Sequence, residues 1–137
     1  MDHFFENTFV QTASYFSVAV LGIIVFLAIF ELVTKYSNWV EIKKGNLAVA
    51  MATGGKIIGI SIIFHYTISQ HASLLGMLVW GVFGFFLLLL SYFMFEFLTP
   101  SFNVDEEIKN GNYAVGFISM VISIGLAFVI GASIIAT

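Results

Sequence analysis

The side chain in the most unusual setting for its chemistry is Lys56, which stands in the middle of an apolar stretch from Leu47 to Tyr66. An ammonium group at the centre of a membrane helix costs roughly 2.5 to 3.5 kcal/mol, and ionisable groups at this depth usually have a function and a partner. Two acidic residues near the ends of other apolar stretches, Glu31 and Glu96, are the candidate partners. A carboxylate beside Lys56 would either hold the lysine in place or form part of a path for protons or small ions.

Helix geometry allows Lys56 to approach either glutamate. At a rise of 1.5 Å per residue, Lys56 lies about 14 Å from the start of its stretch at Leu47, and Glu31 lies about 5 Å before Thr34 at the end of its own. Side chains lean toward the N-terminus of their helix, so the glutamates and Lys56 lean toward one another. We therefore expect Lys56 to pair with Glu31 or Glu96, directly or through water, and the sequence does not choose between them. The alternative is a lysine that extends alone along its aliphatic stem to the membrane surface.

Other groups of reactive residues are sparse. The chain has no cysteine, and it contains no P-loop, nucleophile-elbow or zinc-protease motif. Its histidines, His3, His65 and His71, fall on one side of the predicted membrane, but structural zinc sites usually show tighter ligand spacing, so polar loop residues are the simpler interpretation. We expect no enzymatic activity, no cofactor, no metal ion and no nucleic-acid partner.

The elements that must position Lys56 are membrane helices. The chain has 137 residues, of which 60% are hydrophobic and only 9% are charged, whereas about 25% are charged in typical soluble domains. Four apolar stretches reach the roughly 20 residues that a helix needs to cross a bilayer. These predicted helices are Ala13 to Val33, Leu47 to Tyr66, Ser73 to Leu98 and Tyr113 to Ala136. The predicted fold class is an all-α membrane protein, a four-helix bundle forming a single membrane domain over residues 1–137.

Two segments of the chain repeat each other. The segment from Glu41 to Val49 recurs from Glu107 to Val115, with seven of nine positions identical. Each copy lies between two apolar stretches, so each half of the chain consists of two membrane helices and one loop in the same orientation. We therefore predict two parallel two-helix repeats, the first over about residues 10–66 and the second over about residues 73–136.

The repeated loop predicts a short helical turn that ends at a glycine and is followed by an asparagine. Gly45 and Gly111 suit the left-handed residue that ends such a turn, and Asn46 and Asn112 suit the N-cap of the next membrane helix. Capping is the simpler role for the two asparagines. The alternative is a buried hydrogen bond between helices, or a place in an ion path.

The lysines predict the orientation of the chain, because loops rich in Lys and Arg are retained on the cytoplasmic side. Lys35, Lys43 and Lys44 lie between the first two predicted helices, and Lys109 lies between the last two. The opposite side carries no Lys or Arg. Both longer loops are therefore predicted in the cytoplasm and both termini outside. No small-residue cleavage pattern follows the first apolar stretch, so we expect that helix to be retained.

Small residues predict which helices touch, because helices in lipid associate through close backbone approach. The second and fourth helices carry such residues at regular spacing, which makes them the expected centre of the bundle. The alternative is that the stripe on the fourth helix mediates a homo-oligomer. The candidate packing residues are Gly55, Gly59, Ser119, Ser123, Ala127 and Gly131.

The duplicated patterns Phe-Glu-x-x-Thr and Glu-Ile-Lys-x-Gly-Asn-x-Ala-Val resemble a bacterial membrane family, domain of unknown function 350, the YjfL-like proteins. Its most specific part, Gly-Asn-x-Ala-Val, is matched at Gly45 to Val49 and again at Gly111 to Val115. The resemblance covers essentially the whole chain. It implies a multi-pass protein of the bacterial cytoplasmic membrane with no established activity, some of whose relatives look like partners of phage-shock-type proteins in envelope-stress gene clusters. Lys56 is not part of that pattern, so a role tied to it belongs to this chain.

Two classes of function fit these observations. In the first, the chain is a non-enzymatic component or scaffold of a membrane complex, and its cytoplasmic loops, especially Val104 to Lys109, dock a soluble or peripheral partner. In the second, an oligomer forms a path for protons or small ions that uses the intramembrane Glu, Lys and Asn residues. Four helices are too few for a gated transporter, so the second class requires assembly. We favour the first.

Overall fold

The computed structural model describes residues 6–70 and 73–136, and over these residues it is helical, with connecting turns. The predicted all-α fold with four helices long and apolar enough to cross a membrane is confirmed. The four long helices alternate with two short ones. In chain order the helices are α2 (Thr8–Val33), α3 (Asn38–Lys43), α4 (Leu47–Gln70), α5 (Leu74–Leu98), α6 (Val104–Lys109) and α7 (Tyr113–Ile135).

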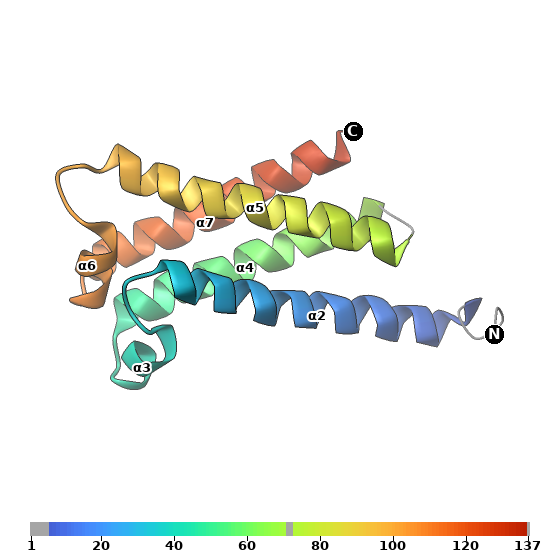
Figure 1. The fold of residues 1–137 in the computed structure, drawn as a ribbon, viewed down its shortest axis with the longest axis horizontal. Coiled ribbons are helices and arrows are strands. Elements are labelled where there is room, and N and C mark those ends of the chain that lie inside the picture. The colour runs from blue at the N-terminus through green and yellow to red at the C-terminus, as the bar shows by residue number, and fades with distance from the viewer. Residues whose placement is uncertain (1–5, 71–72, 137) are drawn as a thin grey trace.

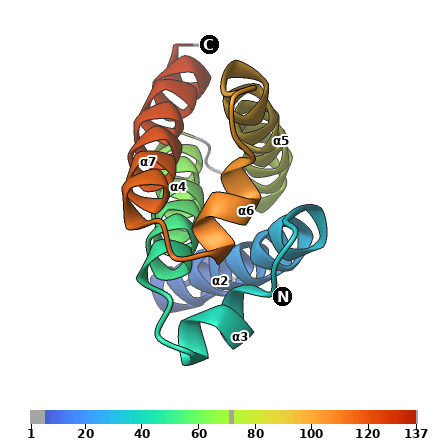
Figure 2. The ribbon, with the colours of Figure 1, turned by 90° about the vertical axis from the view of Figure 1, so that its left-hand side faces the viewer.

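The long helices form a bundle with both short helices at the same end. Figure 1 shows α3 and α6 together at one end of the molecule, while α2 begins and α7 finishes at the opposite end. The view along the bundle in Figure 2 places α4 between α2 and α7, with α6 lying across the end of the helices. Each short helix therefore lies in the connection between two long helices, at the end of the bundle.

The centre of the bundle is the packing of α4 against α7, and it depends on glycine. A Cβ atom added to Gly55 would lie 2.6 Å from Met120 Cα, and one added to Gly116 would lie 2.6 Å from the Ala48 carbonyl oxygen. Such close backbone approach is how helices pack without a side chain between them. Gly59 lies on the same face of α4, where an added Cβ would be 3.2 Å from the carbonyl oxygen of Ser123.

The predicted stripe of small residues on α7 packs inside the chain. Ser119 and Ala127 are buried, and Ala127 lies next to the site of Gly59 on α4. Gly131 lies under the ring of Tyr66, where an added Cβ would be 2.1 Å from the ring atom Cδ2. This face of α7 is therefore covered by α4 of the same chain.

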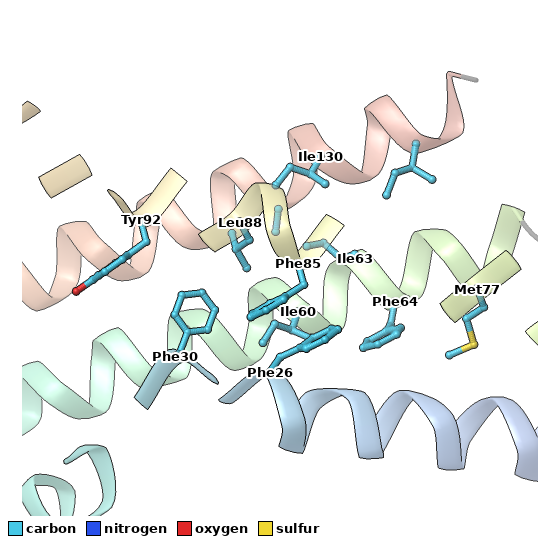
Figure 3. Packing of buried hydrophobic residues seen from close by; sticks show 12 residues of the cluster. Phe26, Phe30, Ile60, Ile63, Phe64, Met77, Phe85, Leu88, Tyr92 and Ile130 are labelled. Atoms are coloured by element: carbon cyan, nitrogen blue, oxygen red, sulfur yellow. The ribbon is translucent and has the colours of Figure 1, made fainter. Parts of the chain in front are cut away.

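Phenylalanine side chains fill the space between α2, α4 and α5. The rings of Phe26 and Phe85 stack with centroids 4.0 Å apart, and Phe30 meets Phe85 edge to face at 5.4 Å. Figure 3 shows this row of rings, with Phe30 and Tyr92 at one end and Phe64 and Met77 at the other. The row is therefore apolar along most of its length and meets polar groups only near Tyr92.

The turns that follow α3 and α6 have the same geometry. Gly45 and Gly111 have φ angles of +87° and +88°, the left-handed region that favours glycine. The next residue caps the following helix in both cases: Asn46 Oδ1 accepts from Val49 N at 3.2 Å, and Asn112 Oδ1 accepts from Val115 N at 3.4 Å. The glycine and capping predictions are confirmed. We call residues 35–46 the first junction and residues 100–112 the second junction.

Candidate functional site

Lys56 is buried in the centre of the bundle. Its side chain is 1% exposed, and α4, which carries it, packs against α2, α5 and α7. Thr53, one turn earlier on the same helix, is buried as well. The lysine therefore does not extend to the membrane surface, which the sequence had left open as the alternative.

Two aromatic rings take the place of polar ligands around the ammonium group. Lys56 Nζ lies 5.2 Å from the centroid of the Phe30 ring and 5.3 Å from that of the Tyr92 ring. Among the described residues, Nζ has no hydrogen-bond partner. Cation–π contacts of this kind contribute up to about 2 kcal/mol when desolvated, which offsets part of the cost of burying the charge.

A carboxylate from the second junction, Asp105, completes the setting of Lys56. Asp105 is 1% exposed on α6; its Oδ1 accepts a short hydrogen bond from the Tyr92 hydroxyl, and its Oδ2 accepts from Lys35 N at 3.1 Å. The link between Asp105 and Lys56 is Tyr92, whose ring lies 5.3 Å from Lys56 Nζ and whose hydroxyl donates to Asp105. Tyr92 thus lies between the two opposite charges, with its ring on the lysine and its hydroxyl on the aspartate.

The two glutamates predicted as partners of Lys56 have different surroundings. Glu96 is half-buried, and its Oε1 accepts a hydrogen bond at 3.4 Å from the hydroxyl of Tyr92, whose ring contacts Lys56. Glu31 Oε1 instead accepts from the Ser37 hydroxyl at 3.1 Å and from Asn38 N at 3.2 Å. Glu31 therefore holds the start of α3, and Glu96 lies in the group around Lys56.

Asn46 and Asn112 lie at the ends of their helices, where each also binds a glutamate. Asn46 Nδ2 donates to Glu41 Oε1 at 3.3 Å, and Asn112 Nδ2 donates to Glu107 Oε2 at 2.9 Å. The hydrogen bond from Asn46 is the main cause that lowers the pKa of Glu41. Asn46 Nδ2 also donates to the Lys109 carbonyl at 2.8 Å, so one of the two caps links the junctions as well.

Four buried polar atoms have no hydrogen-bond partner within the part of the chain that the structure describes. They are Tyr36 Oη, Asn38 Oδ1, Thr53 Oγ1 and Lys56 Nζ. Buried polar groups are normally satisfied by protein or water, so each of these atoms is a position that suits a bound water. Burial, with Asp105 and Glu96 nearby, raises the pKa of Tyr36, so that its hydroxyl stays protonated and able to donate.

Cavities at the junction end of the bundle reach the acidic residues of this group. One, of about 380 Å³, is bordered by Lys35, Glu96 and Asn103, and another, of about 280 Å³, by Lys35, Asn103 and Asp105. Among the described residues, Glu96 and Asp105 are therefore close to the surface at this end of the bundle.

Sequence reasoning missed Asp105, Tyr92 and Tyr36. Asp105 is followed directly by Glu106 and Glu107, and such a run of acidic residues is typical of a solvent-exposed segment. The signal that could have found it is the pair Val104 and Ile108, four residues apart, which marks the buried side of a short helix next to Asp105. Tyr92 was missed because aromatic residues are common in membrane helices and nothing in its sequence position distinguishes it.

The histidines do not form a metal site in the described residues. No group of three or more His, Cys, Asp or Glu able to hold a metal ion occurs over residues 6–70 and 73–136. His65 is exposed on α4, and His3 and His71 lie outside the described residues.

Comparison with known proteins gives one family and uncharacterised relatives. Residues 4–134 match the family described as "Domain of Unknown Function (DUF350)". The chain is similar to the "UPF0719 transmembrane protein YshE" of Bacillus subtilis (strain 168), with 64% identity over 134 residues, 98% of this chain and 100% of the relative. It is also similar to the "UPF0719 inner membrane protein YjfL" of Escherichia coli (strain K12), with 28% identity over 104 residues, 76% of this chain and 77% of the relative. No solved structure matches.

Proposed function

The chain belongs to the DUF350 family of membrane proteins, and from this membership we propose that it is a non-enzymatic, multi-pass component of the bacterial inner membrane that docks a peripheral partner. The docking surface is the face formed by the first and second junctions. The names of the two relatives, one "transmembrane" and one "inner membrane", support the location. The four apolar helices support the multi-pass arrangement.

The observation that carries this proposal is the cross-linking of the two junctions into one surface. Asn46 Nδ2 donates to the Lys109 carbonyl at 2.8 Å, and Lys35 N donates to Asp105 at 3.1 Å. Val104 and Ile108 bury one side of α6 against the bundle, while Glu106 and Lys109 remain exposed. A loop that only connects two membrane helices does not require hydrogen bonds to another loop. A surface that binds a partner benefits from them, because they fix its shape before binding.

A photo-crosslinking experiment in native membranes tests the docking surface. A photoreactive amino acid at Glu106 should give a discrete crosslinked product, and the same residue at Leu75, exposed at the opposite end of the bundle, should not. The product should disappear when Lys109→Glu reverses a charge on the same face. A product whose yield is the same from both positions, or that survives Lys109→Glu unchanged, would contradict docking at the junctions.

The proposed orientation has the junctions in the cytoplasm and both termini outside, following the lysines of the two junctions. Since the chain has no cysteine, single cysteines can report on it. Cysteines at Ser37 and Ser101 should be shielded from an impermeant thiol reagent in intact cells, and one at Ser69 should react. All three serines are exposed in the structure. The reverse labelling pattern would overturn the orientation.

A proton or small-ion path through an oligomer is a second candidate, favoured by the buried Lys56 Nζ without a hydrogen-bond partner. Such a path needs more than one chain, because the row of phenylalanine side chains fills the bundle beyond Lys56. Flux into proteoliposomes that is lost in Lys56→Met and kept in Lys43→Met would favour the path. Vesicles that show no proton or small-ion flux, with the unchanged protein as well as with the variants, would favour docking alone.

A further inference from the structure

Three cavities between α5, α7 and the second junction share lining residues. The first is the cavity of about 380 Å³ at the junction end, and the second, of about 270 Å³, shares Thr99 and Phe102 with it. The third, of about 470 Å³, shares Phe95 with the second. The three cavities are therefore adjacent to one another, and we call them together the α5–α7 groove.

The second and third cavities are apolar and follow one face of α7. Their α7 residues recur every three or four positions, from Ala114 through Ile118, Ile122 and Gly125 to Val129. At a rise of 1.5 Å per residue this face is about 22 Å long. Several of its side chains are exposed, and a Cβ atom added to Gly125 meets nothing within 4 Å. The groove therefore opens toward the lipid and contains space that the protein does not fill.

The first cavity lies at the junction end of the groove, around the last turn of α5, and mixes polar and apolar lining residues. Its polar side chains include those of Lys35, Glu96 and Asn103. Lys35 is held at this point because its backbone N–H donates to the buried Asp105. The mouth of the groove thus offers one ammonium, one carboxylate and one amide.

We propose that the α5–α7 groove binds one glycerophospholipid with a primary-amine head group, of the phosphatidylethanolamine type. One acyl chain lies in the apolar part, the phosphate binds Lys35, and the head-group ammonium binds Glu96. One leaflet contributes about 15 Å of hydrocarbon, half of the bilayer core, so the 22 Å face is long enough for an acyl chain together with its glycerol. The charges at the mouth match a zwitterion that can donate N–H bonds.

The charged mouth distinguishes this occupant from two others. A helix from a second copy of the chain would cover the apolar part but would bring no phosphate to the Lys35 ammonium at the mouth of the groove. A lipid with a purely anionic head group would meet the carboxylate of Glu96 as well as the lysine. The proposal is independent of the docking role, because it depends on the side of the bundle rather than on the exposed face of the junctions.

Gly125 allows the groove to be closed without disturbing the fold. Gly125→Phe places a ring in the apolar part, and the space around Gly125 indicates that the bundle accepts it. The matched control is Gly54→Phe on α4, where an added Cβ also meets nothing within 4 Å but which does not line the groove. For the head group, Lys35→Gln is compared with Lys43→Gln on the exposed side of α3.

Native mass spectrometry of the full chain in detergent tests the proposal, with phosphatidylethanolamine, phosphatidylglycerol and phosphatidylcholine added at equal concentration. We expect a one-to-one adduct with phosphatidylethanolamine that is several-fold more abundant than the other two. Gly125→Phe should abolish it and Gly54→Phe should not; Lys35→Gln should remove the preference and Lys43→Gln should keep it. Equal adducts with all three lipids, an adduct that survives Gly125→Phe, or a dimer that Gly125→Phe disrupts would each overturn the proposal.

Discussion

The first and second junctions have the same turn but different surroundings. Both end in a glycine with φ near +87°, followed by an asparagine that caps the next helix and binds a glutamate. Yet α6 is buried against the bundle through Val104, Asp105 and Ile108, whereas only Asn38 of α3 is fully buried. The shared motif therefore sets the local geometry but not the burial of the short helix, since Ile108 is buried whereas the matching Ile42 is only partly buried.

The differences between the junctions fall at matched positions. At the offset that aligns Glu41 with Glu107, Asp105 corresponds to Trp39, which is 56% exposed. At the same offset Lys56 corresponds to Ile122. The second junction thus has a carboxylate and α4 has a lysine, and Tyr92 connects the two through its hydroxyl and its ring. The opposite charges belong to different halves of the chain, so they link the second junction to the first half of the bundle.

The largest effect should come from removing the buried carboxylate of the second junction. Asp105→Ala removes the acceptor of the Tyr92 hydroxyl and of Lys35 N. A buried donor left without an acceptor costs about 1–3 kcal/mol, and two donors lose their acceptor here, so we expect a loss of several kcal/mol in the free energy of unfolding in detergent.

Two controls belong to this measurement. Trp39→Ala, the matched change in the first junction, and Glu106→Ala, an exposed neighbour, should each change the free energy of unfolding by no more than about 0.5 kcal/mol. Hydrogen exchange should show that Asp105→Ala opens α6 and leaves α3 protected. Equal losses for Asp105→Ala and Trp39→Ala would remove the difference between the junctions.

A double-mutant cycle asks which carboxylate is coupled to Lys56. With Lys56→Met as one change, Asp105→Asn should give a non-additive energy within about 0.5–3 kcal/mol, and Glu96→Gln a smaller one. Glu31→Gln should be additive, because Glu31 binds Ser37 and Asn38. In each coupled pair, adding Lys56→Met should recover part of the stability lost with the carboxylate. Additivity for Asp105 and Glu96 alike would mean that neither carboxylate holds the lysine.

Much of the fold could be predicted from the sequence, because its main signals are local. The lengths of apolar stretches predicted the four long helices, and the Gly-Asn pair predicted the turns at Gly45 and Gly111. The structure extends α4 to Gln70, beyond the predicted end at Tyr66. Counting apolar residues stops at the first polar ones, whereas a helix continues as long as its backbone hydrogen bonds do.

The surroundings of Lys56 could be predicted only in part. Depth along each helix brought Glu31 and Glu96 within range of the lysine, but depth does not say which way a side chain turns. Glu31 turns to α3, and Asp105 reaches Tyr92, whose ring contacts the lysine, because α6 lies across the end of the bundle. That placement depends on tertiary packing of a short helix, for which a charged run in the sequence carries no signal.

Substitutions of Gly45 and Gly111 should have the same effect, because the two turns have the same backbone conformation. Gly45→Ala and Gly111→Ala each force a side chain into the left-handed region, which costs about 1–2 kcal/mol. Neither added Cβ meets an atom within 4 Å, so the cost is one of backbone conformation alone. Urea or heat unfolding in detergent should give equal losses for both, and Asn at either position should lose less than Ala. A clear inequality would mean that the surroundings, rather than the shared turn, set the need for glycine.

The smallest effect separates the two capping asparagines. Asn46→Ala and Asn112→Ala each remove an N-cap, which costs about 1 kcal/mol. Asn46→Ala also removes the hydrogen bond to the Lys109 carbonyl, which adds about 0.5–1.5 kcal/mol and should make it the more destabilising change. Asn46→Asp and Asn112→Asp both keep the capping oxygen and both place a carboxylate beside a glutamate, but only Asn46→Asp also removes the bond to Lys109, so it should be the more destabilising of the two. If Asn46→Ala and Asn112→Ala cost the same, the bond from Asn46 to Lys109 contributes nothing to stability, and the two junctions are held together by Asp105 and the packing of α6 alone.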